Sequence, residues 1–156
     1  PKSLAARGCE TSPRRETRMS GGLADDILKA AKGVYAKLGP GLSEVVYQNA
    51  LCIDLGAGLH SCEHERVLPV FYYGHYVGNA RPGLVVNGVA VIEIKALAKL
   101  DESHATQVRA SLRWLPECVD APNEPRFGLV INFGPNAVEV CHVEAPAVDP
   151  SLTFLE

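Results

Sequence analysis

Two charged residues, Glu93 and Lys95, interrupt the strongly apolar run VAVIEIKAL at residues 89–97. Because side chains alternate between the two faces of a β-strand, Glu93 and Lys95 are predicted to share one face. A carboxylate can hold Mg²⁺, and a nearby ammonium can orient water or stabilise the charge that develops during phosphodiester hydrolysis. A structural ion pair at the end of a strand is an equally good interpretation of this spacing.

The strand that carries this pair is predicted to be covered on both sides. The uncharged positions on both of its faces are apolar, as in sheets that lie between helices. Apolar β-forming residues also surround Tyr73-Gly74 and Asn87-Gly88, two pairs that are typical of tight turns. The sequence therefore predicts a three-stranded antiparallel meander within residues 66–97.

Helices are predicted on either side of the meander, and two further strands follow. Apolar spacing and end signals predict three helices, over residues 23–38, 44–58 and about 101–115. The predicted strands are residues 127–134, which are continuously apolar, and 137–144, which alternate. The order ααβββαββ indicates an α/β fold with a mixed sheet of about five strands, since the third helix supplies a crossover.

The composition is that of an ordinary globular protein. The 156 residues are 47% hydrophobic and 21% charged, and the net charge of −3 gives no general attraction to nucleic acid. No apolar run approaches the roughly 20 residues that a membrane-spanning helix needs. The five cysteines are odd in number and form no C-x-x-C pair, which favours an intracellular compartment, organellar or cytoplasmic, over a disulfide framework.

The N-terminal residues differ from the rest in charge. Residues 1–18 carry a net charge of +3, whereas the remainder carries −6. We expect residues 1–21 to form a basic tail outside the core, residues 22–145 to form the domain, and residues 146–156 to form a C-terminal tail. The basic tail is a candidate contact for nucleic acid or for protein partners in a larger complex. A transit-like segment and a read-through extension are the alternatives.

Four short segments carry a family resemblance: GPGLSEVVYQNAL, VIEIKAL, SHATQ and GLVINFG. In this order and at this spacing they resemble the GxxExxY family of the PD-(D/E)XK nuclease superfamily. The motif that gives the family its name corresponds to residues 41–47, and the resemblance covers about residues 27–143. It implies a restriction-endonuclease-like core, Mg²⁺ or Mn²⁺ as the cofactor, and DNA or RNA as the substrate.

The resemblance also implies a set of site residues. Glu44 from an early helix and Glu93 would bind the metal, together with an Asp from the second strand. Glu93, Lys95 and Gln107 would be the catalytic residues. Without the resemblance, Glu44 is a first-turn carboxylate that the helix dipole stabilises. Gln107 is then a solvent-facing residue of the third helix.

The sequence departs from the family pattern where the Asp is expected. That position is Gly83, and residues 66–92 contain no Asp or Glu that could replace it. A Tyr expected four positions after Gln107 is Ser111. Loss of a direct ligand weakens a Mg²⁺ site that has few carboxylates. The sequence therefore favours a degenerate nuclease, or pseudo-enzyme, that acts as a binding or structural subunit of an assembly. An active Mg²⁺-dependent nuclease and a nucleic-acid-binding module without chemistry remain the alternatives.

Overall fold

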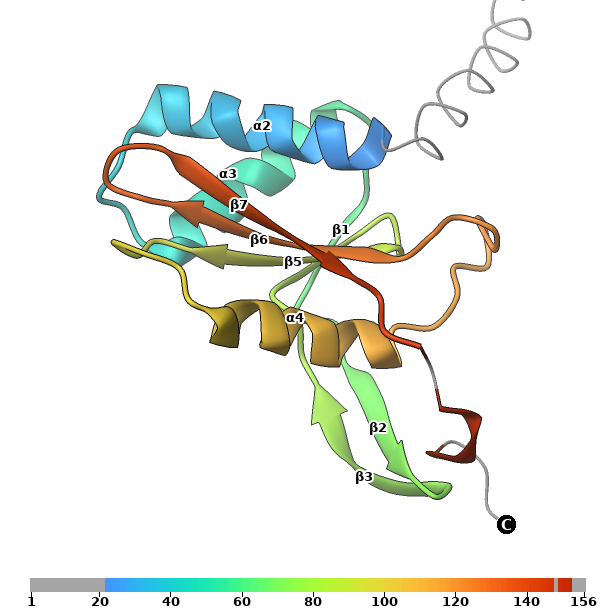
Figure 1. Cartoon of the computed structure of the whole chain (residues 1–156). Coiled ribbons are helices and arrows are strands. Elements are labelled where there is room, and N and C mark those ends of the chain that lie inside the picture. Colours follow the sequence, from blue (N-terminus) through green and yellow to red (C-terminus); the bar gives the residue numbers. More distant parts are fainter. Residues whose placement is uncertain (1–21, 148, 153–156) are drawn as a thin grey trace, which may run out of the picture.

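Helices cover both faces of a twisted sheet in the structure, a computed structural model that describes residues 22–147 and 149–152 (Figure 1). Helices α2 (Gly22–Leu38) and α3 (Glu44–Ala57) lie on one face, and α4 (Glu102–Trp114) lies on the other. The expected tail over residues 1–21 lies outside the described residues. At the other end, residues 150–152 form a short 3₁₀ turn.

The sheet contains five strands and is mixed, which confirms the expected fold class. Its strands, in spatial order, are β1 (Cys62–His64), β4 (Leu84–Val86), β5 (Ala90–Lys95), β6 (Phe127–Phe133) and β7 (Val138–Glu144). The β5–β6 pair is parallel and the other pairs are antiparallel. Helix α4 connects the two parallel strands, as a parallel pair requires.

The predicted meander forms only in part. Strands β2 (Leu68–Tyr72) and β3 (His75–Ala80) pair with each other in a separate two-stranded sheet, and β1 takes the place beside β4. The expected second strand is divided because Pro82 has no N–H to donate to a ladder, and the chain bends at Gly83. Both predicted turns, at Tyr73-Gly74 and Asn87-Gly88, are present.

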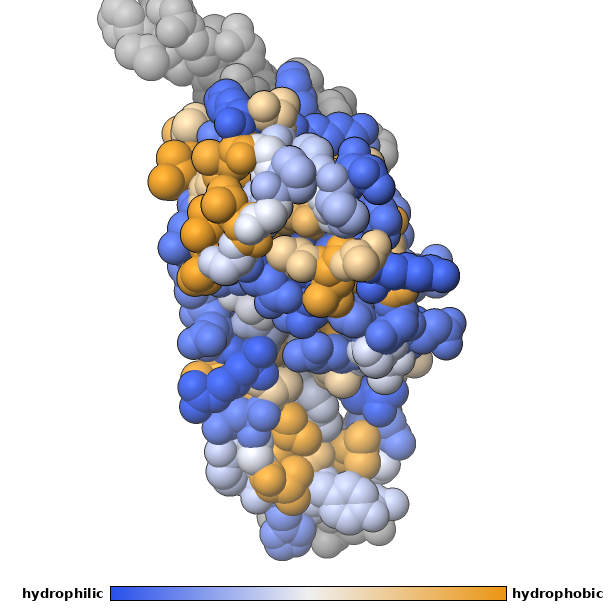
Figure 2. Space-filling model, turned by 90° about the vertical axis from the view of Figure 1, so that its left-hand side faces the viewer, coloured by the Kyte–Doolittle hydropathy of each residue, from blue (hydrophilic) through white to orange (hydrophobic). Residues whose placement is uncertain are grey.

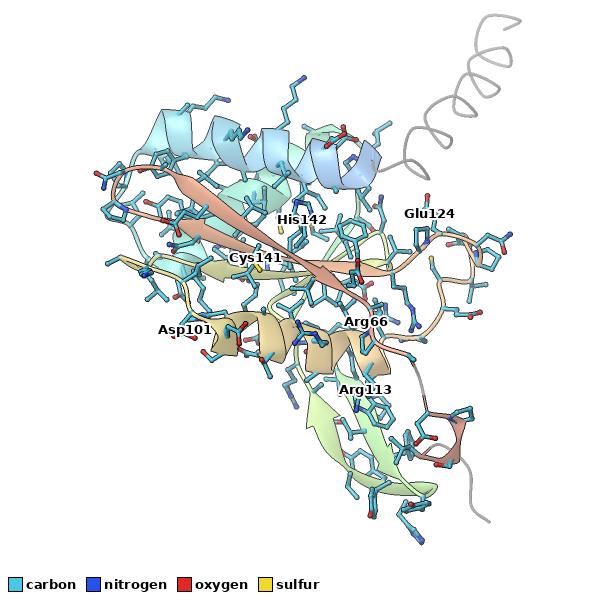
Figure 3. All side chains as sticks on the ribbon, viewed as in Figure 1. Arg66, Asp101, Arg113, Glu124, Cys141 and His142 are labelled. Atoms are coloured by element: carbon cyan, nitrogen blue, oxygen red, sulfur yellow. The ribbon has the colours of Figure 1, made fainter. Side chains whose placement is uncertain are left out.

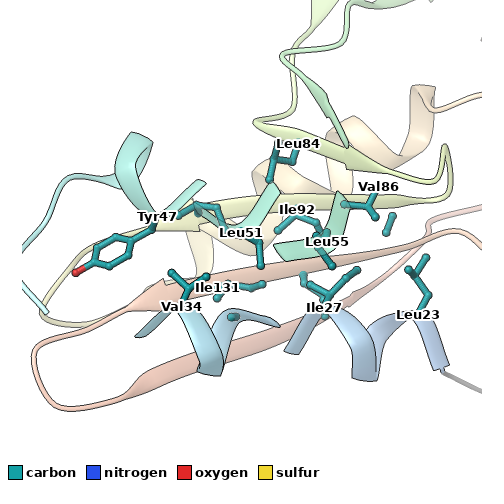
Figure 4. Close-up of a cluster of buried hydrophobic side chains, with 14 of the residues drawn as sticks. Leu23, Ile27, Val34, Tyr47, Leu51, Leu55, Leu84, Val86, Ile92 and Ile131 are labelled. Atoms are coloured by element: carbon teal, nitrogen blue, oxygen red, sulfur yellow. The ribbon is translucent and has the colours of Figure 1, made fainter. Parts of the chain in front are cut away.

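The core consists of two apolar layers, one on each face of the sheet. The layer under α2 and α3 contains alternate residues of β5, among them Ile92 and Ile94 (Figure 4). The layer under α4 contains Val91 together with Val108 and Leu112 of that helix. The prediction that β5 is covered on both sides is confirmed, and Glu93 and Lys95 continue the α4 side of the strand.

Helix α4 packs tightly against the sheet at Gly128 on β6. A Cβ atom there would lie 2.3 Å from Cγ1 of Val108 and 3.0 Å from Cδ1 of Leu112. We expect Gly128→Ala to lower the free energy of unfolding by about 1–3 kcal/mol, because the helix must move outward. Urea denaturation measures this loss. Gly56→Ala is the matched control, since its Cβ would meet no atom within 4 Å and it should not destabilise the protein. Equal stability of the two variants would contradict this packing.

Candidate functional site

The structure brings Glu93 and Lys95 together at the end of β5. The Nζ atom of Lys95 lies 3.4 Å from Oε1 of Glu93, and their side chains are 18% and 14% exposed. The ion pair that the spacing alone suggests is therefore present. Both side chains keep access to solvent, so a substrate phosphate or a cation can reach them.

Gly83 stands next to this pair. A Cβ atom on Gly83 would lie 3.5 Å from Oε2 of Glu93 and 3.4 Å from the backbone oxygen of Ile92. The pairing of Leu84 with Ile92 places Gly83 opposite Glu93, one step further along the two strands. The position where the family pattern has an Asp is thus beside the carboxylate with which that Asp would share a metal ion.

Gln48 completes this group, although it is not among the residues predicted from the sequence. Its Oε1 atom would lie 3.3 Å from a Cβ on Gly83, and its Nε2 atom is 3.1 Å from Nδ1 of His64 on β1. The amide nitrogen donates to His64, and the amide oxygen is the atom that lies next to the Gly83 Cβ position. Gln48 lies four residues after Glu44 on α3, and this helical spacing is the signal that could have identified it.

The two other predicted site residues, Glu44 and Gln107, are less closely associated with the pair. Glu44 is the first residue of α3 and is exposed, one helical turn before Gln48. Gln107 is exposed on α4. In the part of the chain that the structure describes, neither side chain forms a hydrogen bond or ion pair with Glu93 or Lys95. The centre of the candidate site is therefore Glu93, Lys95 and Gln48.

The start of α4 is fixed by a capping interaction at Asp101 (Figure 3). Its carboxylate accepts a hydrogen bond from the hydroxyl of Ser103 and another, of 2.7 Å, from the backbone N–H of Ser103. These hydrogen bonds hold the pKa of Asp101 below its ordinary value. The cap satisfies a backbone donor of the first helical turn and so fixes where α4 begins.

Asn132 fixes the chain that follows Lys95. It is fully buried on β6, opposite Lys95 in the parallel register. Its side-chain oxygen accepts a hydrogen bond of 2.8 Å from the N–H of Leu97, and its amide nitrogen donates one of 2.9 Å to the oxygen of Leu97. Beyond the end of β5, the Asn132 side chain therefore takes the place of a backbone partner in the strand-to-strand hydrogen bonds.

We expect Asn132→Ala to destabilise the protein by about 2–4 kcal/mol, because both backbone groups of the partly buried Leu97 lose their hydrogen-bond partner. Urea denaturation checks this value. Asn136→Ala, an exposed change in the β6–β7 turn, is the control and should cost less than about 0.5 kcal/mol. A similar, small effect of both changes would mean that water replaces the Asn132 contacts at Leu97.

A pocket lies at the other end of the sheet. A cavity of about 400 Å³ is lined by apolar residues such as Leu23 and Phe127 and by charged ones such as Arg126 and Glu144, and neither Glu93 nor Lys95 lines it. Phe127 pairs with Ala90 at the start of β5, whereas the charged pair is at its end. The candidate site is therefore separate from this cavity.

Cys52 and Cys62 are neighbouring thiols of low reactivity. Burial, with the neighbouring Cys62 thiol as the second cause, raises the pKa of Cys52 to about 12. Burial also raises the pKa of Cys62. Both thiols stay protonated near neutral pH, and a protonated thiol is a poor nucleophile and a poor metal ligand.

The comparison with protein families agrees with this geometry. Residues 22–143 match the family model described as the PD-(D/E)XK nuclease superfamily, and the chain belongs to that superfamily. No curated protein and no solved structure matches the chain significantly. Among the described residues, no helix is long and apolar enough to cross a membrane.

Nucleases of this superfamily generally use Mg²⁺ or Mn²⁺. These ions prefer several hard oxygen ligands, usually with more than one carboxylate in such a site. Within residues 22–147 and 149–152, no three His, Cys, Asp or Glu side chains are arranged to hold a metal ion. Glu93 is beside Gly83, and the neighbouring Gln48 offers a neutral amide oxygen. The residues present therefore do not fit a complete site for a divalent ion.

Proposed function

We propose that the chain is a degenerate nuclease of the GxxExxY type that binds nucleic acid as a subunit of a larger assembly. One observation carries this proposal: the space opposite Glu93 is occupied by Gly83 and by the neutral side chain of Gln48. The expected basic tail, residues 1–21, would add contacts to nucleic acid or to protein partners. Those residues lie outside the described part of the chain.

Charge balance supports the loss of hydrolysis. Lys95 lies 3.4 Å from Glu93 and neutralises its charge. With an additional Asp at position 83, the group would carry a net negative charge and would attract a divalent cation. With Gly83 the pair is neutral overall, so the electrostatic attraction for Mg²⁺ is much weaker.

The second candidate is an active metal-dependent nuclease that uses Glu44, Glu93, Lys95 and Gln107. The accessibility of the Glu93–Lys95 pair favours it, since both side chains keep contact with solvent. The amide oxygen of Gln48 would then serve as a neutral metal ligand. Glu44 would bind the ion through a bridging water molecule.

Cleavage of labelled DNA and RNA distinguishes the two candidates. Single-stranded and duplex substrates are incubated with Mg²⁺ or Mn²⁺ and the parent protein, Glu93→Gln or Lys95→Ala. We expect the parent to cleave no faster than Glu93→Gln. Glu139→Gln, an exposed change on β7, controls for contaminating nucleases. Parent cleavage that survives Glu139→Gln but is lost in Glu93→Gln and Lys95→Ala would establish the active nuclease instead.

A further inference from the structure

The β2–β3 hairpin exposes a group of aromatic side chains. Tyr72, Tyr73 and Tyr76 are 59%, 46% and 60% exposed, and Val77 beside them is 60% exposed. The hairpin projects away from the five-stranded sheet, beyond α4 (Figure 1). Figure 2 shows apolar side chains on the surface at this lower end of the molecule. Large aromatic side chains that gather on one projecting element indicate an interaction surface.

The aromatic rings are held in place by one another. The ring of Phe71 packs 6.4 Å from Trp114 on α4, and the ring of Tyr76 packs edge-on against Phe71 at 6.2 Å. Tyr72 and Tyr73 form a second edge-to-face pair at 4.7 Å. Because Tyr76 is supported from one side and remains exposed, it presents a ring in a fixed orientation. A fixed ring loses little conformational freedom when a ligand binds.

The turn between the two strands contains an unfavourable residue. Tyr73 has a φ of 45° and Gly74 has a φ of 76°. Positive φ at both central positions of a two-residue turn favours Asn, Asp or Gly, and a bulky side chain is uncommon there. The fold alone would be better served by Asn at position 73. A Tyr at the tip is explained if its ring is needed for contact with a partner.

The charge around the hairpin favours an anionic partner. The protein has a net charge of −3, yet residues 66–92 contain no Asp or Glu. Arg81, which follows β3, is exposed and forms no ion pair with a described residue. Arg113 at the end of α4 also lies beside the hairpin (Figure 3), but the nearby Asp149 offsets its charge, so Arg81 is the better candidate to contact an anion.

The hairpin also leads directly to the candidate site. Arg81 is two residues before Gly83, whose Cβ position is 3.5 Å from the Glu93 carboxylate. At about 3.3 Å per residue along β3, Tyr76 and Arg81 are separated by roughly 17 Å. A chain of nucleotides lying along β3 would thus extend from the tyrosines to Glu93.

We propose that the hairpin is a stacking platform for the unpaired bases of single-stranded nucleic acid. Tyr73 and Tyr76 stack on bases, and Arg81 contacts a phosphate and directs the strand toward Glu93 and Lys95. This inference rests on the proposed function, in that the domain binds nucleic acid. Stacking on aromatic rings requires bases that are free of a duplex, so the hairpin selects single strands.

Fluorescence anisotropy with a labelled 20-nucleotide single strand and its duplex, without metal ions, tests the proposal. We expect the parent to prefer the single strand and Tyr76→Ala to weaken single-strand binding about tenfold, with less effect on the duplex. Tyr76→Phe keeps the ring and should bind like the parent. Ile53→Ala, a change at a 72% exposed apolar residue on α3, is the matched control and should also bind like the parent. Circular dichroism melting confirms that each variant is folded.

Four results would overturn the stacking platform. Unchanged single-strand binding in both Tyr73→Ala and Tyr76→Ala would reject it, while the proposed nucleic-acid binding would stand. If Tyr76→Ala weakens the binding of the single strand and of the duplex equally, the hairpin does not select single strands. If the tyrosine variants sediment differently from the parent without nucleic acid, but bind nucleic acid as the parent does, the hairpin is a protein interface instead. Absence of any binding by the parent would instead reject the proposed function itself, and this inference with it.

Discussion

Replacing Gly83 with aspartate should make the protein bind Mn²⁺, whereas the parent should not respond to this ion. The backbone of Gly83 is outside the left-handed region, so an Asp can adopt its conformation. Its Cβ would lie 3.3 Å from the side-chain oxygen of Gln48, a flexible group that can move by a few tenths of an ångström. The new carboxylate would then stand beside Glu93 and provide the missing anionic ligand.

The expected effect is large enough to measure by thermal unfolding. Without metal, two neighbouring carboxylates repel each other, and Gly83→Asp should be less stable than the parent. At a Mn²⁺ concentration of about 100 times the Kd, binding adds about 2.7 kcal/mol. For a domain of this size that corresponds to a rise in Tm of about 5–10 °C. The parent should shift by less than about 1 °C.

Gly83→Asn is the matched control, because it adds the same volume without the charge. The protein should accept Asn at this position as well as Asp, and the Tm of this variant should not shift with Mn²⁺. If Gly83→Asp folds but responds to Mn²⁺ no more than Gly83→Asn does, the correspondence between this site and the nuclease family is wrong. A large Mn²⁺ response of the parent would show instead that Glu93 and its present neighbours already form a metal site.

Tyr47→Ala should be strongly destabilising, by about 3–5 kcal/mol. The Tyr47 ring is fully buried and stacks on Phe133 with ring centres 4.3 Å apart. Its hydroxyl donates a 2.6 Å hydrogen bond to the backbone oxygen of Gly39 and accepts one of 3.2 Å from the N–H of Leu42. The Tyr of the motif therefore has a structural role, because it fixes the loop before α3 and so the position of Glu44.

Tyr47→Phe separates the contribution of the packed ring from that of the hydroxyl's hydrogen bonds. It keeps the stacked ring and removes only the hydroxyl, so we expect a loss of about 1–2 kcal/mol. Urea denaturation of the two variants and the parent gives both values. Amide hydrogen exchange at Leu42 should be faster in Tyr47→Phe, since that N–H loses its acceptor. A Tyr47→Ala loss below about 1 kcal/mol would be incompatible with the packing described above.

The local pattern of the sequence was sufficient to place the charged pair. The alternation of residues 89–97 predicts which side chains share a face of β5, and the structure confirms that assignment. The turns at Tyr73-Gly74 and Asn87-Gly88 were also predictable, because each pair contains a Gly, a residue type that adopts a positive φ without strain. These features depend on neighbours within a few residues in the sequence.

Features that depend on distant partners were not predicted. The pairing of β1 with β4 joins Cys62 to Val86, and nothing in the composition of residues 62–64 indicates it. In the sequence, Gln48 cannot be distinguished from other polar residues of a helix. Its place beside Gly83, next to the start of β4, is visible only in the fold. Asn132 did offer a signal: a polar residue at the end of an apolar strand needs a partner when it is buried. Its partner, Leu97, could be identified only from the structure.

The hairpin begins and ends at one point of the sheet, since the N–H of Glu65 donates a 3.1 Å hydrogen bond to the oxygen of Gly83. A segment inserted between two paired residues can change length at little cost, because each doubling of a flexible loop adds only about 0.6 kcal/mol of closure entropy. Leu68, which is buried against α4, is the anchor that a replacement must keep. Glu65 and Gly83 are therefore natural junctions for grafting a different segment, which would replace the projecting part of the scaffold without redesign of its core.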